Sequence, residues 1–308
     1  MSNFSHISVL LNEAIDGLNI KPGGVYIDGT TGGGGHSYEI AKRLTDGRLI
    51  CVDRDPDAIA AAKERLKEFD CITFVNDRFS EVKSICNRLE IDRIDGMILD
   101  LGVSSYQLDT AERGFSYHMP APLDMRMSKE GMTAADLVNT LSEQELANII
   151  YKYSDERLSR KIASAIVEAR KIAPIETTDV LAQLISDCYP AKLKKDGHPA
   201  RRTFQSLRIA VNGEMREAEQ GINDCFELLN EGGRISVITF HSIEDRLVKQ
   251  CFAAFCKGCE CPPDFPVCVC GKKPRAQLVN RKPITASKEE LEVNSRSRSA
   301  KLRILEKL

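Results

Sequence analysis

The sequence of 308 residues has no long apolar run and no excess of charge of one sign. No stretch approaches the roughly 18 consecutive apolar residues of a membrane span, and the first 18 residues lack the basic-then-apolar order of a signal peptide. We therefore expect a cytoplasmic protein with no membrane partner. With 42% hydrophobic and 29% charged residues, the chain can bury a full core as one large domain or two smaller ones.

The near-neutral total charge of −2 hides an uneven distribution. Residues 271–308 hold 11 Lys and Arg against 4 Asp and Glu, which gives this tail +7 and leaves −9 for the rest. A second basic stretch covers residues 192–195, Arg201, Arg202 and Arg208, with Phe204 among them as a possible stacking group. This pattern is compatible with a nucleic-acid partner that meets only one side of the protein.

Short apolar runs alternate with helical patterns in the first hundred residues. The runs typical of strands are 25–28, 49–53, 72–75 and 94–99, and those typical of helices are 56–69 and 80–89. Such alternation predicts an α/β fold with a mostly parallel sheet that is covered on both faces.

The alternation stops near residue 105 and returns near residue 206. Amphipathic helices fill the interval, one over residues 155–172 and one that begins at a capping box from Ser142 to Glu145. A strand at 234–240, a helix at 242–255 and a last strand at 300–305 follow. We therefore expect a discontinuous core, 1–105 with 206–308, and an inserted all-helical domain, 106–205.

A glycine-rich turn follows the first strand, between Asp28 and His36. Glycines allow the backbone to approach a ligand closely, so a nucleotide-like ligand is expected here. The spacing fits neither the dehydrogenase fingerprint nor the P-loop, because the required third glycine and the Gly-Lys-Ser/Thr sequence are missing. The alternative is a turn that merely joins strand to helix.

Acidic residues end the first two strands. Asp53 suits a ribose diol, whereas Asp28 would repel a pyrophosphate and suits a cationic ligand end. S-adenosylmethionine matches both, since it has no phosphate and carries a sulfonium and an ammonium. We therefore predict S-adenosylmethionine as the cofactor.

The fourth strand ends at Asp100, where the carboxyl ends of parallel strands border the ligand crevice. An exocyclic base amine is a poor nucleophile, and a carboxylate that accepts its N–H groups would orient it. Methylation of a pyrimidine ring carbon would need a cysteine nucleophile, and no cysteine lies between Cys86 and Cys188. We therefore favour transfer to nitrogen with Asp100 as the catalytic residue, the alternative being a loop cap.

Several ordered motifs together resemble the RsmH/MraW family, the bacterial 16S ribosomal RNA cytosine-N4 methyltransferases. They cover almost the whole chain and comprise Asp28-Gly-Thr-x-Gly-x-Gly-Gly-His36, Asp53-Arg-Asp-Pro56, Leu99-Asp-Leu-Gly-Val-Ser-Ser105, Gln107-Leu-Asp, Glu112-Arg-Gly-Phe-Ser116, Pro122-Leu-Asp-Met-Arg-Met127, Arg202-Thr-Phe-Gln-x-Leu-Arg-Ile209 and Phe240-His-Ser-Ile-Glu-Asp-Arg246.

The resemblance implies a class I S-adenosylmethionine-dependent methyltransferase fold, Rossmann-like, with a helical insertion. It implies N4-methylation of a cytidine in the decoding centre of 16S rRNA, by direct in-line transfer. The implied substrate is 16S rRNA within the small ribosomal subunit. The cofactor contacts that it implies are Gly34, Gly35, His36, Asp53, Phe79, Asp100 and Gln107. The sequence departs from the family at Tyr106, where Pro or His is commoner.

Three points stay open at this stage. The face that stacks on the target base could come from Tyr106, Phe115, Phe240 or His241. The function could instead be that of an RNA-binding ribosome-assembly factor or of a methyltransferase for another RNA. The sequence does not decide between a monomer and a homodimer.

Five of the eleven cysteines lie close together, in residues 256–271. Cytoplasmic cysteines stay reduced, so such a group indicates metal before disulfides. Four of the five could bind a structural zinc ion in tetrahedral geometry; the five are Cys256, Cys259, Cys261, Cys268 and Cys270. The alternative is a loop of reduced thiols.

Overall fold

The computed structural model describes residues 8–259, 261, 267 and 270–308, and the chain divides into two compact units. Unit 1 consists of Met1–Gly102 and Met215–Leu308, and unit 2 of Val103–Glu214. Unit 1 holds a sheet and unit 2 is helical, which confirms the expected α/β class with a helical insertion. The domain bounds expected from the sequence, with an insertion over 106–205, stay a prediction.

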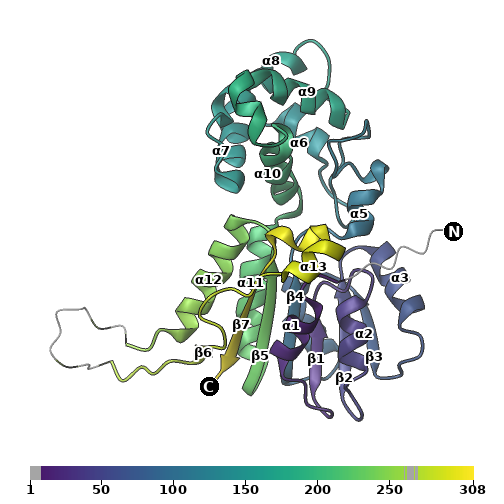
Figure 1. Cartoon of the computed structure of the whole chain (residues 1–308), viewed down its shortest axis with the longest axis vertical. Coiled ribbons are helices and arrows are strands. Elements are labelled where there is room, and N and C mark those ends of the chain that lie inside the picture. Colours follow the sequence, from purple (N-terminus) through teal and green to yellow (C-terminus); the bar gives the residue numbers. More distant parts are fainter. Residues whose placement is uncertain (1–7, 260, 262–266, 268–269) are drawn as a thin grey trace. The chain divides into compact units, whose positions relative to one another are not determined.

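Unit 1 contains one seven-stranded sheet, in the order β3-β2-β1-β4-β5-β7-β6 (Figure 1). All neighbours pair in parallel except β7, which is antiparallel to both β5 and β6. The strands are β1 (Val25–Asp28), β2 (Arg48–Asp53), β3 (Ile72–Asn76), β4 (Ile94–Asp100), β5 (Leu229–Thr239), β6 (Ala276–Leu278) and β7 (Lys301–Lys307). The strand order reverses between β1 and β4, and a ligand crevice is expected at the carboxyl ends of these two strands.

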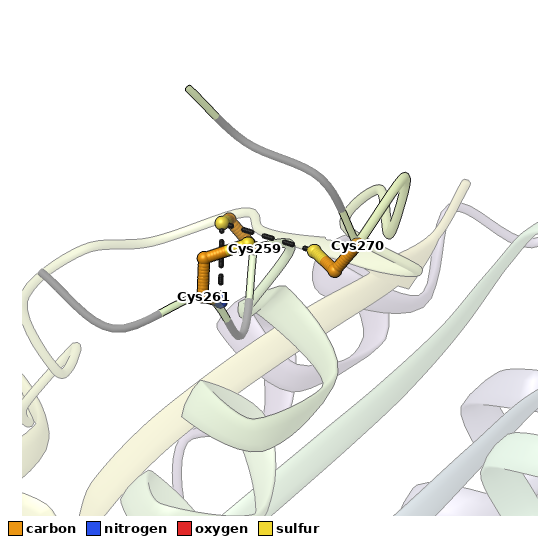
Figure 2. A group of neighbouring side chains, drawn as sticks. All are labelled: Cys259, Cys261 and Cys270. Carbon is orange, nitrogen blue, oxygen red and sulfur yellow. Dashed lines mark hydrogen bonds between the residues drawn. The ribbon is translucent and has the colours of Figure 1, made fainter. Parts of the chain in front are cut away.

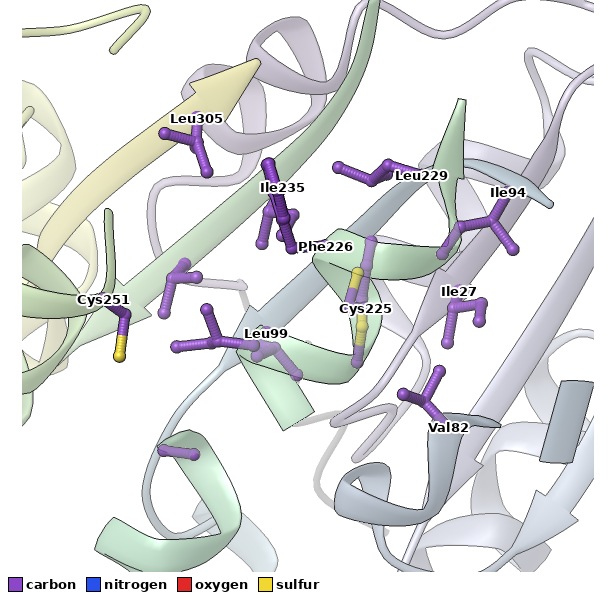
Figure 3. Packing of buried hydrophobic residues seen from close by; sticks show 14 of the residues in the cluster. Ile27, Val82, Ile94, Leu99, Cys225, Phe226, Leu229, Ile235, Cys251 and Leu305 are labelled. Carbon is purple, nitrogen blue, oxygen red and sulfur yellow. The ribbon is translucent and has the colours of Figure 1, made fainter. Parts of the chain in front are cut away.

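Helices cover both faces of this sheet because alternate strand residues are apolar on both sides. In β4, Met97 and Leu99 pack with helices α4, α11 and α12, whereas Ile98 packs with α1, α2 and α3. Figure 3 shows the first of these layers, where Phe226 and Leu305 lie among the strand residues. The helices are α1 (Leu11–Leu18), α2 (Gly35–Ala41), α3 (Pro56–Arg65), α4 (Val82–Arg88), α11 (Glu214–Leu228), α12 (Ser242–Cys256) and α13 (Lys288–Val293).

Unit 2 has its own apolar core. Its helices are α5 (Ser105–Asp109), α6 (Ala134–Thr140), α7 (Glu143–Ser154), α8 (Ser159–Arg170), α9 (Thr178–Cys188) and α10 (Ala200–Asn212). The predicted capping box is present, since Ser142 Oγ accepts the Glu145 N–H and the Glu145 carboxylate accepts the Ser142 N–H. Buried Leu146, Ile162 and Leu207 show that each of three helices turns an apolar stripe inward.

The strand and helix positions agree closely with the sequence pattern, with two differences. β6 has only three residues and no apolar alternation, so no pattern indicated it. The helix expected over 155–172 begins at Ser159, because Asp155 has a left-handed backbone that ends the preceding helix. In the part of the chain that the structure describes, no helix combines the length and apolarity needed to cross a membrane.

Candidate active site

The glycine-rich turn is anchored to the strands on both sides of β1. Gly29 N–H donates to the Ile98 carbonyl at 3.0 Å, and Thr31 N–H donates to the Val52 carbonyl at 3.1 Å. Gly32 and Gly34 have φ of 50° and 76°, a left-handed conformation that favours glycine. The turn therefore lies at the reversal of strand order, in a fixed shape.

Asp28 holds this turn from inside. Its carboxylate accepts the Ser37 hydroxyl at 2.6 Å and the Thr30 N–H at 3.2 Å, and the residue is 1% exposed. Burial raises the pKa of Asp28 to about 6, against the opposing effect of these hydrogen bonds. Asp28 thus shapes the turn, and it can act on a cationic ligand through its charge rather than through an exposed face.

Asp53, at the end of β2, ties the turn to the neighbouring strand. Its two carboxylate oxygens accept the N–H groups of Gly32 and Asp55, each at 2.8 Å. Burial raises its pKa to about 6. Because each carboxylate oxygen has two lone pairs, one N–H per oxygen leaves capacity to accept the hydroxyls of a diol.

Asp100 ends β4 beside the same turn. Its backbone N–H donates to Thr30 Oγ1 at 2.6 Å, whereas its side-chain Oδ1 is buried and has no hydrogen-bond partner among the described residues. Burial, assisted by the charges of Asp28 and Glu244, raises its pKa to about 8. A buried acceptor without a partner is costly in a folded protein, so this oxygen is a candidate to receive a ligand or substrate hydrogen.

The first turn of α12, which follows β5, contributes a further acid. Glu244 is 1% exposed, and its Oε2 accepts the Phe240 N–H at 2.8 Å. His241 Nδ1 accepts the Glu244 N–H at 3.2 Å, and His241 Nε2 lies 2.9 Å from Glu244 Oε1. His241 is therefore held as the cap of α12, which favours its structural interpretation over base stacking.

The carboxyl ends of β1, β2 and β4 are strongly acidic. Asp28, Asp53 and Asp100 make no ion pair with any residue that the structure describes, and Arg54 is paired with Glu217 at 3.0 Å instead. Such a site disfavours phosphates and favours a cation. The residues present thus fit the sulfonium and ammonium of S-adenosylmethionine, as predicted.

Three predicted cofactor contacts in the turn pack against the chain itself. A Cβ on Gly34 would lie 3.1 Å from Leu66 Cδ1, and one on Gly35 would lie only 1.9 Å from Ser8 Oγ. His36 is 5% exposed, and its Nε2 donates to the Val9 carbonyl at 3.1 Å. Their side-chain positions face protein, so a ligand could meet only their backbone. Their cofactor contacts stay predictions.

Phe79 and Gln107 lie in different units. Phe79 begins a short 3-10 helix after β3, and a Cβ on Gly221 of α11 would lie 2.5 Å from its ring, so one side packs on the core while the residue stays partly exposed. Gln107 belongs to unit 2, where its Oε1 accepts the Ser104 N–H at 3.0 Å in a capping box. Both contacts to the cofactor stay predictions.

Among the candidates for base stacking, Phe240 lies in unit 1, one strand away from Asp100. It follows β5, in which Ile238 is the register partner of Asp100, and its ring is 3.7 Å from the position of a Cβ on Gly102. Phe240 is partly exposed, whereas Phe115 is 7% exposed inside unit 2. Tyr106 is 57% exposed, also in unit 2.

The basic stretch of unit 2 differs in two ways from the expectation. Phe204 is 3% exposed and belongs to the helical core, so the prediction that it stacks on RNA is wrong. Arg208 forms a bidentate pair with Glu214 at 2.8 Å, which takes it out of the basic surface. The exposed ring of His198 lies nearby instead, stacked on the partly buried Tyr117 with centroids 4.5 Å apart.

The structure brings together three of the five clustered cysteines, Cys259, Cys261 and Cys270 (Figure 2). Their sulfurs all lie within 4.8 Å of one another. The Cys256 sulfur is not part of this group, and Cys268 lies outside the described residues. No disulfide joins the cysteines that the structure describes.

Sequence reasoning missed Thr30, Ser37 and Glu244 as parts of the site. Thr30 and Ser37 act through short hydrogen bonds to Asp100 and Asp28. Both are hydroxyl residues that flank the glycines in the sequence, but such residues are common in turns and do not by themselves indicate a site. Glu244 was visible as the third residue after His241, in the spacing of a capping box.

A glycine turn and an acidic crevice at the carboxyl ends of β1, β2 and β4, without a phosphate motif, define an S-adenosylmethionine-dependent methyltransferase of the α/β class. The chain belongs to the MraW methylase family, whose profile matches residues 3–308. The resemblance of its motifs to this family is thereby confirmed.

Curated relatives match over the full length. Proteins named ribosomal RNA small subunit methyltransferase H from Clostridium botulinum (strain Kyoto / Type A2) and from Finegoldia magna are 55% and 51% identical, and each match covers 99% of both chains. Among solved structures, a putative rRNA methylase from Clostridium thermocellum matches 98% of this chain and 100% of its own, with a TM-score of 0.47 and 13% identity.

Proposed function

We propose that this chain methylates the N4 amine of a cytidine in the decoding centre of 16S rRNA, with S-adenosylmethionine as methyl donor. The names of the relatives support small-subunit rRNA as the substrate. The observation that carries the choice of an amine is Asp100, whose buried Oδ1 has no hydrogen-bond partner in the described chain. We place the reaction in the cytoplasm, where the small subunit is assembled.

The residues around the turn would hold the cofactor. When bound, S-adenosylmethionine supplies a methyl group activated by the positive sulfonium. Asp53 would accept the ribose hydroxyls, while the charges of Asp28 and Asp100 favour the cationic end. We also propose that Phe79 packs on the adenine, and that Gln107 and the backbone of Gly34, Gly35 and His36 complete the site.

Asp100 would orient the amine. The lone pair of an exocyclic base amine is delocalised into the ring, and it becomes a better nucleophile when its N–H groups are bound and the nitrogen turns toward the methyl group. Ionised Asp100 can accept one N–H, and the same carboxylate can take up the proton that leaves nitrogen as the new N–C bond forms. The transfer is then direct and in line, without a covalent enzyme intermediate.

The cysteine next to the turn fits this choice of nitrogen over carbon. Cys51 is buried, and its thiol donates to Ser37 Oγ at 3.2 Å. Burial, followed by the charge of Asp28, raises the pKa of the Cys51 thiol far above its usual range, so it stays protonated. A protonated buried thiol is a poor nucleophile toward C6 of a pyrimidine.

We propose Phe240 as the surface on which the target base stacks, because it follows the strand next to Asp100 and is partly exposed. The rest of the RNA would meet exposed basic residues of both units. These are Lys192, Lys194, Arg201 and Arg202 in unit 2 and Arg296 and Arg298 in unit 1. A preformed particle that presents folded RNA suits basic residues confined to such short stretches better than naked RNA does.

The test compares labelled-methyl transfer to 30S subunits, to naked 16S rRNA and to tRNA, with purified full-length protein. We expect transfer to 30S subunits to be the fastest, and digestion to nucleosides should yield N4-methylcytidine. Equal transfer to tRNA would overturn the choice of substrate, and label in 5-methylcytidine would overturn the choice of nitrogen.

A further inference from the structure

We propose that Cys259, Cys261 and Cys270 bind one structural Zn²⁺ ion, a site that is independent of the proposed methyl transfer. The Sγ atoms of Cys259 and Cys270 are 3.8 Å apart. Two thiolates at about 2.3 Å from a tetrahedral zinc ion are about 3.8 Å apart, whereas a disulfide needs about 2.05 Å. The spacing of this pair thus matches a shared metal ion, and Cys261 completes a triangle of sulfurs around it (Figure 2).

The backbone around the cysteines is shaped to bring them together. Cys261 N–H donates to Cys259 Sγ at 3.4 Å, an interaction that stabilises a sulfur with thiolate character. Gly271 directly follows Cys270 with φ of 63°, which allows the chain to turn back sharply after this ligand. Gly258 lies so close to the returning chain that an added Cβ would be 2.8 Å from Pro274 Cδ.

The loop that carries these cysteines is closed at its base but has little core of its own. Arg275 N–H donates to the Phe255 carbonyl at 3.0 Å, where α12 ends and the chain returns toward β6. Beyond this point the apolar Val267 is 69% exposed, and Cys259 is exposed as well. Among the described residues of the loop, apolar burial therefore contributes little, and binding of a metal ion to several of them at once would supply folding free energy.

Zinc is the metal of choice, since it binds thiolates in tetrahedral geometry and brings no redox chemistry to a loop that has a structural role. With three cysteine ligands, the fourth position of the tetrahedron is left to water.

The experiment measures zinc in full-length protein purified without chelators and without an affinity column that carries metal. We expect about one equivalent per chain by elemental analysis. Replacing zinc by Co²⁺ should give the intense visible absorption of tetrahedral cobalt and a thiolate charge-transfer band. Cys259→Ser and Cys270→Ser should each lose most of the zinc, and trypsin should then cleave faster after Lys257 and Lys272.

The matched control is Cys71→Ser, which removes a partly exposed thiol outside the loop and should leave the zinc content unchanged. Cofactor affinity should stay within about twofold in all three variants, which shows that the fold around the turn persists. Wild-type protein with less than about one tenth of an equivalent of zinc and no cobalt–thiolate band would overturn the proposal. Equal zinc loss in Cys71→Ser would do so too.

Discussion

At the scale of single residues, the site is defined by acids whose charge the protein itself does not neutralise. Burial raises the pKa of Asp53 to about 6 and that of Asp100 to about 8. Without a ligand, these buried carboxylates lower the free energy of unfolding when they are ionised. A cationic ligand offsets this loss by pairing with their ionised forms. The same residues therefore account for both cofactor choice and pH dependence.

The first prediction concerns Asp100→Asn. Binding of a cation favours ionised Asp100, so cofactor binding releases its proton while the pH lies below about 8. The affinity of the wild type relative to Asp100→Asn should therefore rise roughly tenfold from pH 6.5 to 8.5 and level off above the folded pKa. Isothermal titration calorimetry measures both proteins, and the ratio cancels the titration of the ligand's own amine. A ratio independent of pH would contradict this role of Asp100.

The pH dependence that Asp100 gives to stability has the opposite sign to the one it gives to cofactor affinity. Because the pKa of Asp100 is raised in the folded state, its contribution to the free energy of unfolding is full below about pH 4 and is lost as pH rises toward 8. Without ligand, Asp100→Asn should thus be more stable than the wild type at pH 8 by on the order of 1 kcal/mol, and the difference should shrink at pH 5. Urea unfolding at the two pH values measures this, and a wild type that is the more stable at pH 8 would refute it.

At the scale of elements, the glycine turn fixes the end of β4. Thr30 Oγ1 accepts the Asp100 N–H at 2.6 Å, which makes Thr30 a positioning residue rather than a catalytic one. The turn and the ends of β2, β4 and β5 thus form one hydrogen-bonded rim, in which Asp53 accepts the Gly32 N–H and Leu101 N–H donates to the Ile238 carbonyl at 3.0 Å.

Thr30→Val should lower kcat by about tenfold, because the Asp100 N–H loses its acceptor and the carboxylate moves out of line. Thr30→Ser keeps the hydroxyl and should restore most of the rate. Single-turnover methyl transfer to 30S subunits measures the rate, and the unfolding free energy is measured beside it. If Thr30→Ser is as slow as Thr30→Val, hydrogen bonding by this hydroxyl does not position Asp100.

Phe240 sits at the same rim and is expected to affect RNA rather than cofactor. Phe240→Ala should raise KM for 30S subunits by about tenfold, since stacking of one base contributes roughly 1–3 kcal/mol, and it should leave cofactor affinity unchanged. Phe240→Tyr keeps the ring and serves as control. An unchanged KM in Phe240→Ala would move the stacking role to another residue.

The sequence predicts the elements of the sheet well, because apolar alternation, turn glycines and capping residues all act locally. It also locates Asp53 and Asp100, since strand ends meet at one edge of a parallel sheet. It does not show that Phe204 is buried, because that depends on how helices distant in sequence pack. It does not show that Arg208 pairs with Glu214 either, because that depends on the direction in which the chain turns at Gly213, between α10 and α11. The sequence also does not indicate the three-residue β6, because this strand is defined by its pairing with β7.

At the scale of the whole molecule, the acidic body and the basic tail have different roles. Part of the tail's charge is internal, since Arg303 and Lys301 pair with Asp245 of α12 at 2.7 and 3.3 Å. Other basic residues of the tail, including Arg296 and Arg298, are exposed. The count of +7 in the sequence therefore overstates what the tail can offer to RNA.

The exposed basic residues of unit 2 give a further prediction. Lys194→Ala combined with Arg201→Ala should weaken binding to 30S subunits, and the slope of log affinity against log salt should fall by about 1 to 2, because phosphate contacts release counterions. Lys67→Ala is the control, since Lys67 is exposed and pairs with Glu64 at 2.6 Å. A salt slope equal to that of the control would exclude these residues from the RNA contact.

The most direct test of the central claim is the position of the methyl group that this protein adds. The 30S subunits are incubated with the purified protein and S-adenosylmethionine, and their 16S rRNA is digested and analysed by mass spectrometry. We predict one N4-methylcytidine per particle with the wild type and at least a hundredfold slower formation with Asp100→Asn. A methyl group on any other atom, or equal rates for the two proteins, would contradict the account.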